Sequence, residues 1–167
     1  PVNYYFERDG NVPVGDTWVN SAYPSNGTEG YRFKSLKAWA LSVMMEERSH
    51  LREKMVLFWH NHFAIANVLD ANLVYNYINL LRENAFGNFK FLIEKITVEP
   101  AMLQFLNGND NTKTAPNENY ARELLELYTV GKGPLIAPGD YSTFTEQDVS
   151  AVAKILTGWK DQGNFRK

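Results

Sequence analysis

The sequence contains no cysteine, and its positive and negative charges are almost balanced. The lack of cysteine excludes disulfides, thiolate catalysis, zinc–thiolate sites and iron–sulfur clusters from these 167 residues. Seventeen basic residues stand against nineteen acidic ones, a net charge of −2, so the strongly cationic footprint of a nucleic-acid-binding protein is missing. No apolar run approaches the roughly 20 residues that a helix needs to cross a bilayer. We therefore expect no nucleic-acid partner and no membrane span.

The composition is typical of an ordered globular protein. Apolar residues make up 44% of the chain and charged residues 22%, far from the profile of disordered sequences. The length suits one folding unit with a continuous core. The chain opens at Pro1 without an initiator methionine or signal peptide and stops at Lys167 soon after a helical pattern. We expect it to be a piece of a longer domain, whose partners are the rest of that domain or another protein chain.

Two regions differ in their periodicity. Residues 1–30 carry recurrent glycine and proline among aromatics and predict an irregular arm. From Tyr31 onward, apolar residues recur at spacings of three and four, which predicts a helical domain over residues 31–167. Glu46-Glu47-Arg48 is expected to end the first helix, and a second is expected from about Ser49 to Phe63. The predicted fold class is mainly α, a compact multi-helix domain of short helices with an irregular N-terminal arm.

Helix-start signals punctuate the domain. Asp70, Asn88 and Asn117 are placed as N-caps, Pro100 suits a first helical turn, and Thr145 begins a capping box with the aspartate three residues later. Helical spacing predicts that the second helix turns its Phe58 side inward and Glu53 away from it. The predicted core contains these residues: Trp39, Phe58, Leu80, Phe91, Leu124, Leu127 and Ile155.

The segment Trp59-His60-Asn61-His62-Phe63 places two imidazoles two residues apart among aromatic side chains. Imidazole is the commonest metal ligand in proteins and a good general base near neutral pH. On a regular helix the two rings would point about 200° apart, so they share a metal only where the helix ends or distorts. The plain alternative is one histidine hydrogen-bonded in the core and the other facing solvent.

A second polar block opens the helix at Asn117. At about 100° per residue, its charged and amide side chains fall within an arc of about 140°. The members of this face are Glu118, Asn119, Arg122, Glu123 and Glu126. Carboxylates in the first turn beside an asparagine cap favour a well-formed helix start, and the plain alternative is a solvated helix face.

The loop between residues 107 and 118 has a partial likeness to a calcium-binding loop. Asn107, Asn109 and Asn111 supply oxygens at its first, third and fifth positions, and Glu118 stands at the twelfth. Thr112 occupies the position where the sharp turn of such a loop needs glycine. A calcium-stabilised binding domain is therefore the weakest of the functional hypotheses.

Five blocks, taken in order, resemble an uncharacterised bacterial family known as domain of unknown function 1800. They include Phe58–Phe63, Arg82–Phe89, Pro100–Leu103, Pro116–Leu127 and Thr145–Val149, and the resemblance covers roughly residues 35 to 160. It implies an exported bacterial protein, periplasmic, secreted or on the cell surface, with further N- and C-terminal parts. No activity comes with the family, but its two polar blocks imply that His60, His62, Asn117, Glu118, Arg122 and Glu123 meet in space.

Two functional hypotheses follow. The first is a hydrolase in which His60, His62, Glu118, Arg122 and Glu123 are catalytic and His60, His62 and Glu123 hold a divalent metal ion. Arg122 would then orient an anionic substrate. The second is a non-catalytic component of a cell-surface or secretion assembly, in which the same polar cluster fixes how helices pack. Both predict that the helix beginning at Asn117 packs beside the segment ending in His62. At least one of Glu118, Arg122 or Glu123 is then expected within hydrogen-bond reach of His60, Asn61 or His62.

Overall fold

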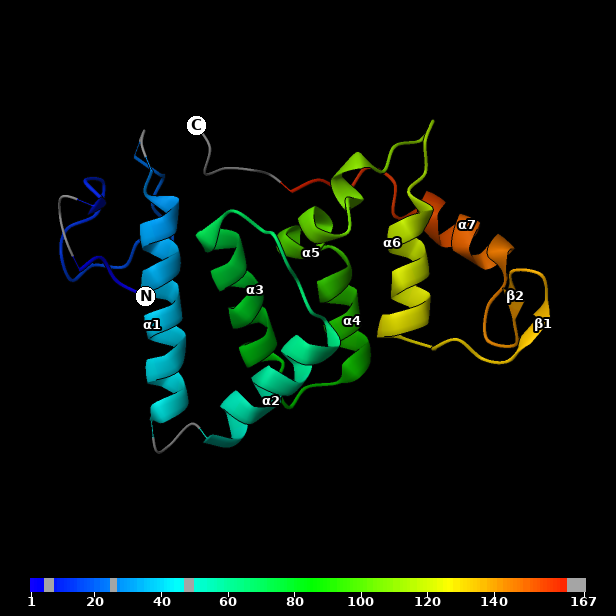
Figure 1. Ribbon diagram of the computed structural model, residues 1–167, viewed down its shortest axis with the longest axis horizontal. Helices are drawn as coiled ribbons and strands as arrows, with labels where there is room; N and C mark the ends of the chain where they lie inside the picture. Colours follow the sequence, from blue (N-terminus) through cyan, green and yellow to red (C-terminus); the bar gives the residue numbers. More distant parts are fainter. Residues whose placement is uncertain (5–7, 25–26, 47–49, 162–167) are drawn as a thin grey trace. The chain divides into compact units, whose positions relative to one another are not determined.

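The computed structural model describes residues 1–4, 8–24, 27–46 and 50–161 (Figure 1). The described part is mainly helical, as predicted, and its only paired strands form one small hairpin. The turn expected at Glu47 and Arg48 and the helix start expected at Ser49 lie outside the described residues. No described helix is long and apolar enough to span a membrane.

The helices are α1 (Glu29–Met45), α2 (His50–His62), α3 (Ala71–Glu83), α4 (Phe89–Thr97), α5 (Pro100–Phe105), α6 (Glu118–Glu123) and α7 (Glu146–Ile155). A 3₁₀ turn, η2 (Gly108–Asp110), precedes α6, and a π-helical segment, η3 (Leu124–Tyr128), follows it directly. Strands β1 (Leu135–Ala137) and β2 (Asp140–Tyr141) pair antiparallel.

The chain forms two compact units. Among the described residues, unit 1 comprises Pro1–His60 and Asn67–Phe86, and unit 2 comprises Asn61–Ala66 and Gly87–Asp161. Helix α2 therefore supplies His60 to unit 1 and His62 to unit 2. The division into an arm over residues 1–30 and a helical domain over residues 31–167 stays a prediction.

A buried ion pair holds the irregular N-terminal segment in unit 1. The Arg32 guanidinium on α1 donates to both carboxylate oxygens of Asp9, at 2.6 and 3.1 Å, and both side chains are completely buried. The same guanidinium donates to the carbonyls of Ser21 and Ala22. Trp18 is fully buried in the adjoining apolar cluster. The described residues before α1 are thus irregular in backbone conformation but fixed by these contacts.

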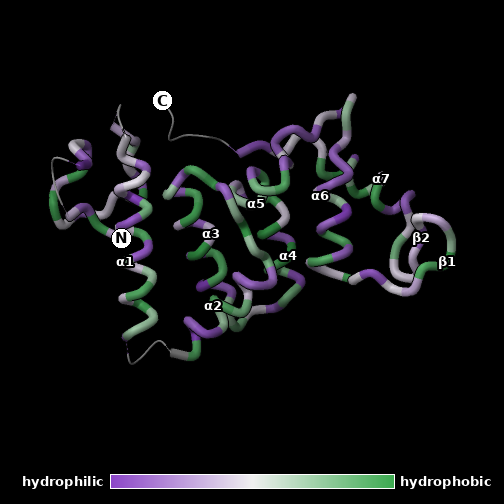
Figure 2. Tube along the Cα trace, viewed as in Figure 1, coloured by the Kyte–Doolittle hydropathy of each residue, from purple (hydrophilic) through white to green (hydrophobic). Residues whose placement is uncertain are grey.

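The core of unit 2 is built from the inner faces of its short helices. Leu92 and Ile96 of α4, Met102 of α5 and Tyr120 of α6 are fully buried. A further cluster joins α6 to α7, with Ala121 packed near Phe144, Val149 and Ala153. Both apolar and polar residues occur along α4 and α7 (Figure 2), and the apolar ones recur at helical spacing, so each of these helices buries one face.

The predicted helix starts are confirmed. The side chains of Asp70, Asn88 and Asn117 accept hydrogen bonds from backbone N–H groups in the first turns of α3, α4 and α6. Thr145 forms the full capping box at α7. Pro100 occupies the first turn of α5, whose N-cap is Glu99. These motifs are local, which is why the sequence could indicate them.

The predicted core is only partly right. Leu124 is buried, and Trp39 and Leu80 are half-buried, whereas Phe58, Phe91, Leu127 and Ile155 are exposed. The buried face of α2 carries Glu53 and Val56, so the prediction chose the wrong side of that helix. Leu127 turns outward because the π-helical segment fits an extra residue into its turn and shifts the helical register.

We predict that Asp9→Ala destabilises unit 1 by about 3–5 kcal/mol, because it leaves a buried guanidinium without its counter-charge. Urea unfolding followed by tryptophan fluorescence measures the loss, since Trp18 lies beside the pair. Asp16→Ala, at an exposed position in the same segment, is the control and should change little. Equal stability of the two variants would show that the Arg32–Asp9 pair does not organise the segment.

Candidate functional site

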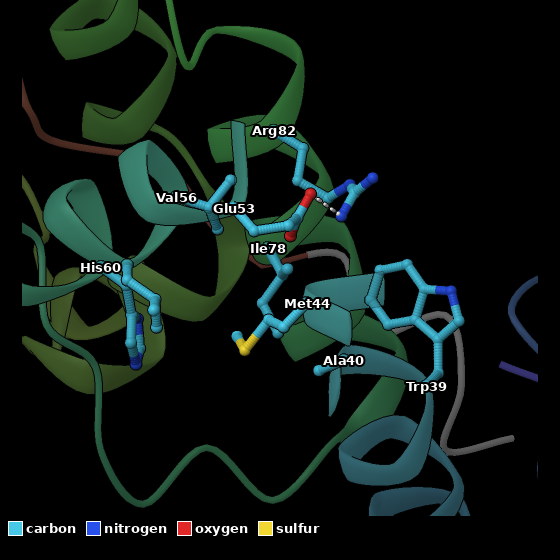
Figure 3. Close-up of a pocket in the computed structure, with 9 residues that line it drawn as sticks. Trp39, Ala40, Met44, Glu53, Val56, His60, Ile78 and Arg82 are labelled. Atoms are coloured by element: carbon cyan, nitrogen blue, oxygen red, sulfur yellow. Dashed lines mark hydrogen bonds and ion pairs between the residues drawn. The ribbon is translucent and has the colours of Figure 1, made fainter. Parts of the chain in front are cut away.

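A small cavity lies between α1, α2 and α3 in unit 1 (Figure 3). Its volume is about 60 Å³. The lining residues are Trp39, Ala40, Met44, Glu53, Val56, Leu57, His60, Ile78 and Arg82. Glu53, Val56 and His60 line one side because positions three, four and seven apart share one face of a helix. The cavity has a mainly apolar lining with a few polar groups, as small-ligand sites do, but its volume is well below the roughly 300–1,000 Å³ of such sites.

The polar edge of this cavity is the ion pair between Glu53 on α2 and Arg82 on α3. Arg82 Nη1 lies 2.5 Å from Glu53 Oε1, and the Glu53 side chain is only 6% exposed. The guanidinium also lies 5.5 Å from the centre of the Trp39 ring. In Figure 3 the pair stands above the Trp39 ring, while His60 and Met44 border the opposite part of the cavity. The pair ties α2 to α3.

His60 makes a second tie between the same two helices. Its Nδ1 lies 3.1 Å from the hydroxyl of Tyr77, which is fully buried on α3. Burial lowers the pKa of the His60 imidazole below its ordinary value, so the ring is neutral at pH 7. The neighbouring Trp59 donates from its indole to the carbonyl of Ala85 at 3.1 Å. One end of α2 is thus fastened to α3 and the turn after it by side-chain hydrogen bonds.

In unit 2, His62 contacts the end of the π-helical segment. Its Nε2 lies 3.1 Å from the carbonyl oxygen of Tyr128, and since a carbonyl only accepts, Nε2 carries the proton. The rings of Phe63, Phe89 and Tyr128 surround the imidazole at centroid distances of 4.5 to 6.2 Å. Tyr128 is the last residue of this segment, and the carbonyls at the end of a helix lack partners within it, so His62 satisfies one of them.

The polar face of α6 binds α7. Arg122 donates to both carboxylate oxygens of Glu146, at 2.6 and 2.7 Å, and this hydrogen-bonded guanidinium lowers the pKa of the Glu146 carboxyl. Glu118 is exposed, and Glu123 is half-buried. His62 contacts the backbone of Tyr128 in η3, the segment that follows α6. The packing of α6 itself beside the segment ending in His62 stays a prediction. A hydrogen bond from His60, Asn61 or His62 to Glu118, Arg122 or Glu123 stays a prediction.

The loop before α6 uses its amides internally. Asn111 is fully buried, donates to the carbonyl of Ala153 at 2.8 Å and accepts from the backbone N–H of Asn117 at 2.9 Å. Asn117 donates to the carbonyls of Leu106 and Asn107 while capping α6. Asn109 Oδ1 accepts from the N–H of Asp161. The side-chain oxygens of Asn109 and Asn111, two of the four that a calcium loop would turn toward an ion, are therefore bonded to backbone N–H groups.

The residues predicted to hold a metal ion fall into both units, with His60 in unit 1 and His62 and Glu123 in unit 2. Within the described ranges, no group of three or more histidine, aspartate or glutamate side chains is arranged to hold a metal ion. Nor does any buried side-chain nitrogen or oxygen of the described residues lack a hydrogen-bond partner. The buried polar side chains of the described residues are therefore all hydrogen-bonded within the protein.

Sequence reasoning missed three residues of the cavity and its ties: Glu53, Tyr77 and Arg82. A signal for Glu53 was present, because it precedes His60 by seven residues and so lies on the same helix face. The partners on α3 are 17 and 29 residues away from His60 and Glu53, respectively. No local spacing rule reaches that far.

Glu99 is an unexpected buried carboxyl in unit 2. Its Oε2 accepts from the backbone N–H groups of Ala101 and Met102 at 2.7 and 3.1 Å, capping α5. Burial raises the pKa of Glu99 from 4.5 to about 7, against the lowering effect of these two hydrogen bonds. The carboxyl therefore titrates near neutral pH, although it contacts no other candidate site residue shown here.

We predict that unit 2 becomes less stable as the pH rises from 5 to 8. Because the folded-state pKa of Glu99 lies above its unfolded value, the contribution is complete below pH 4.5 and is lost as the pH passes 7. The loss amounts to about 3 kcal/mol. Glu99→Gln keeps an oxygen acceptor and cannot ionise, so its urea midpoint should vary less over this range. If the urea midpoint depended on pH equally in the parent protein and the variant, Glu99 would not be the group responsible.

Searches of curated proteins and of solved structures gave no significant match. Residues 16–167 match the family described as "Protein of unknown function (DUF1800)", which extends the region of resemblance beyond residues 35 to 160. Because this match covers most of the chain, the protein belongs to the DUF1800 family.

Proposed function

We propose that this chain is a non-catalytic helical part of an exported protein, a component of a cell-surface or secretion assembly. The proposal rests on the hydrogen-bond partners of the side chains in the two polar blocks. His60, His62, Asn117 and Arg122 each bond to the backbone or to a side chain of another segment in their own unit. In this role the polar blocks specify how short helices pack.

The energetics of burial support this role. A helix of six to thirteen residues buries few apolar side chains, so directional bonds between neighbours help to select one arrangement. The ties on α2 are the more consequential ones, because Glu53 and Tyr77 are buried and water does not readily replace a hydrogen bond that is lost there. The Arg122–Glu146 pair is largely solvated and adds orientation more than stability.

The divalent-metal hydrolase remains the competing proposal. It requires imidazole nitrogens and carboxylates directed at a common point, with one coordination position open for water. His62 directs its Nε2 proton at a carbonyl, and Arg122 is already held by both oxygens of Glu146. Because these hydrogen bonds already occupy His62 Nε2 and the Arg122 guanidinium, we prefer the structural role.

Export is proposed from the family resemblance. Fractionation of cells that produce the full-length protein with a C-terminal epitope tests it directly. We expect the epitope in the periplasmic, surface or culture-medium fraction, and recovery in the cytoplasm alone would contradict the proposal.

For the structural role, we predict that His60→Ala lowers the stability of the full-length protein by about 1 kcal/mol, because the hydrogen bond between the His60 ring and the buried Tyr77 hydroxyl is lost. Thermal unfolding followed by circular dichroism measures the change. Glu118→Ala removes an exposed side chain from the other polar block and serves as the matched control. If the two variants melt together, His60 is not a packing residue and the proposed role fails for this block.

A further inference from the structure

We propose that the outward face of α2 docks on an anionic lipid surface. In this contact Leu51, Met55 and Phe58 enter the boundary between headgroups and acyl chains, while Arg52 and Lys54 contact lipid phosphates. The inference goes beyond the packing role proposed above, because the residues that tie α2 to α3 lie on the opposite face of the helix. It rests on the exposure of the apolar side chains and on the positions of the two cations.

Helix α2 turns its more polar side inward. Glu53, Val56 and His60 border the cavity between the helices (Figure 3), whereas Leu51 is 66% exposed and Phe58 is 57% exposed. A surface helix normally buries its apolar stripe and presents its polar face to water. The reversal leaves apolar area in contact with water, so covering that area with an apolar medium stabilises the protein.

Two cations flank this apolar stripe. At about 100° per residue, Leu51, Met55 and Phe58 fall within an arc of about 60° around the helix. Lys54 lies about 40° beyond one edge of the arc, and Arg52 lies about 60° beyond the other. Both cations are exposed, and among the described residues neither has an ion-pair partner. Long cationic side chains beside an apolar stripe reach headgroups while their stems stay in the interface.

The charge of α2 favours an anionic surface over a second copy of this chain. The only acid on α2 is Glu53, which is buried and paired with Arg82. A two-fold contact of the stripe with itself would bring the cations of both copies together without a carboxylate between them, whereas lipid phosphates neutralise them. The net charge of −2 on the whole chain opposes the contact only weakly, because charges more than about 8–10 Å away are largely screened at physiological ionic strength.

A lipid surface also suits the form of the face. The stripe follows the outward side of a single helix, so α2 can lie parallel to the surface with its apolar side chains at the acyl boundary. Lipids adapt to the side chains that enter them, and the contact needs no complementary groove.

Sedimentation of the full chain with unilamellar vesicles tests the proposal. Vesicles of phosphatidylcholine alone are compared with vesicles of phosphatidylcholine and phosphatidylglycerol in equal parts, at neutral pH and constant ionic strength. We expect the partition coefficient to be at least about tenfold higher for the anionic vesicles, because each cation near such a surface favours binding. Added salt should reduce the difference. Equal partition into the two kinds of vesicle would overturn the proposal.

Charge reversals separate the stripe from the net charge of the chain. Arg52→Glu with Lys54→Glu changes the net charge by the same amount as Lys90→Glu with Lys113→Glu, at two exposed positions of unit 2. We expect the first pair to lower the partition into anionic vesicles at least about tenfold and the second pair to lower it less than about twofold. Equal losses would show a response to net charge alone and would refute the assignment to α2.

The apolar part of the contact is tested by Leu51→Ser, with Leu69→Ser as the matched control, because Leu69 is 63% exposed elsewhere in unit 1. We expect the first substitution to weaken the partition about fivefold and the second to leave it unchanged. The comparison of vesicles needs no variant, so the proposal stays testable if Leu51→Ser fails to fold. Binding to neither kind of vesicle would overturn it and leave the stripe to a protein partner. A concentration-dependent dimer abolished by Leu51→Ser would overturn it in favour of a second copy.

Discussion

The buried Arg32–Asp9 pair is the constraint on which the structure of unit 1 depends. A guanidinium without solvent must be matched by an opposite charge and by acceptors for its remaining protons, and Asp9, Ser21 and Ala22 supply them. Meeting this requirement fixes the path of an otherwise irregular segment before α1 begins. The same rule, that a buried polar group needs a partner, recurs at Glu53 with Arg82 and at Asn111 with its backbone partners.

The sequence predicted what is local and missed what is distant. Asp70 and Thr145 cap helices through backbone groups two or three residues away, so residue type and position were enough. The Arg32–Asp9 and Arg122–Glu146 pairs span 23 and 24 residues and depend on how helices pack. Helix α2 was assigned the wrong buried side because it has apolar residues on more than one face. Its inward face includes a glutamate whose partner no local pattern could identify.

The candidate site shows the same contrast. The two polar blocks were recognisable as the family's distinctive segments, and the contact between His62 and Tyr128 joins the first block to the segment after the second. What could not be foreseen was which carbonyl His62 contacts, or the α3 partners of Glu53 and His60. In unit 1 the tie between Glu53 and Arg82 has two consequences, because it fastens α2 to α3 and leaves the adjacent cavity without net charge.

In the role proposed above, the histidine and carboxylate residues of the two polar blocks hold helices together and bind no catalytic metal ion. Elemental analysis of the full-length protein, purified from its native host without chelators, distinguishes this role from that of a metal-dependent hydrolase. We expect no divalent transition metal at a stoichiometric level. One equivalent of zinc, manganese or iron per chain, lost in the His62→Ala variant while the protein stays folded, would contradict it.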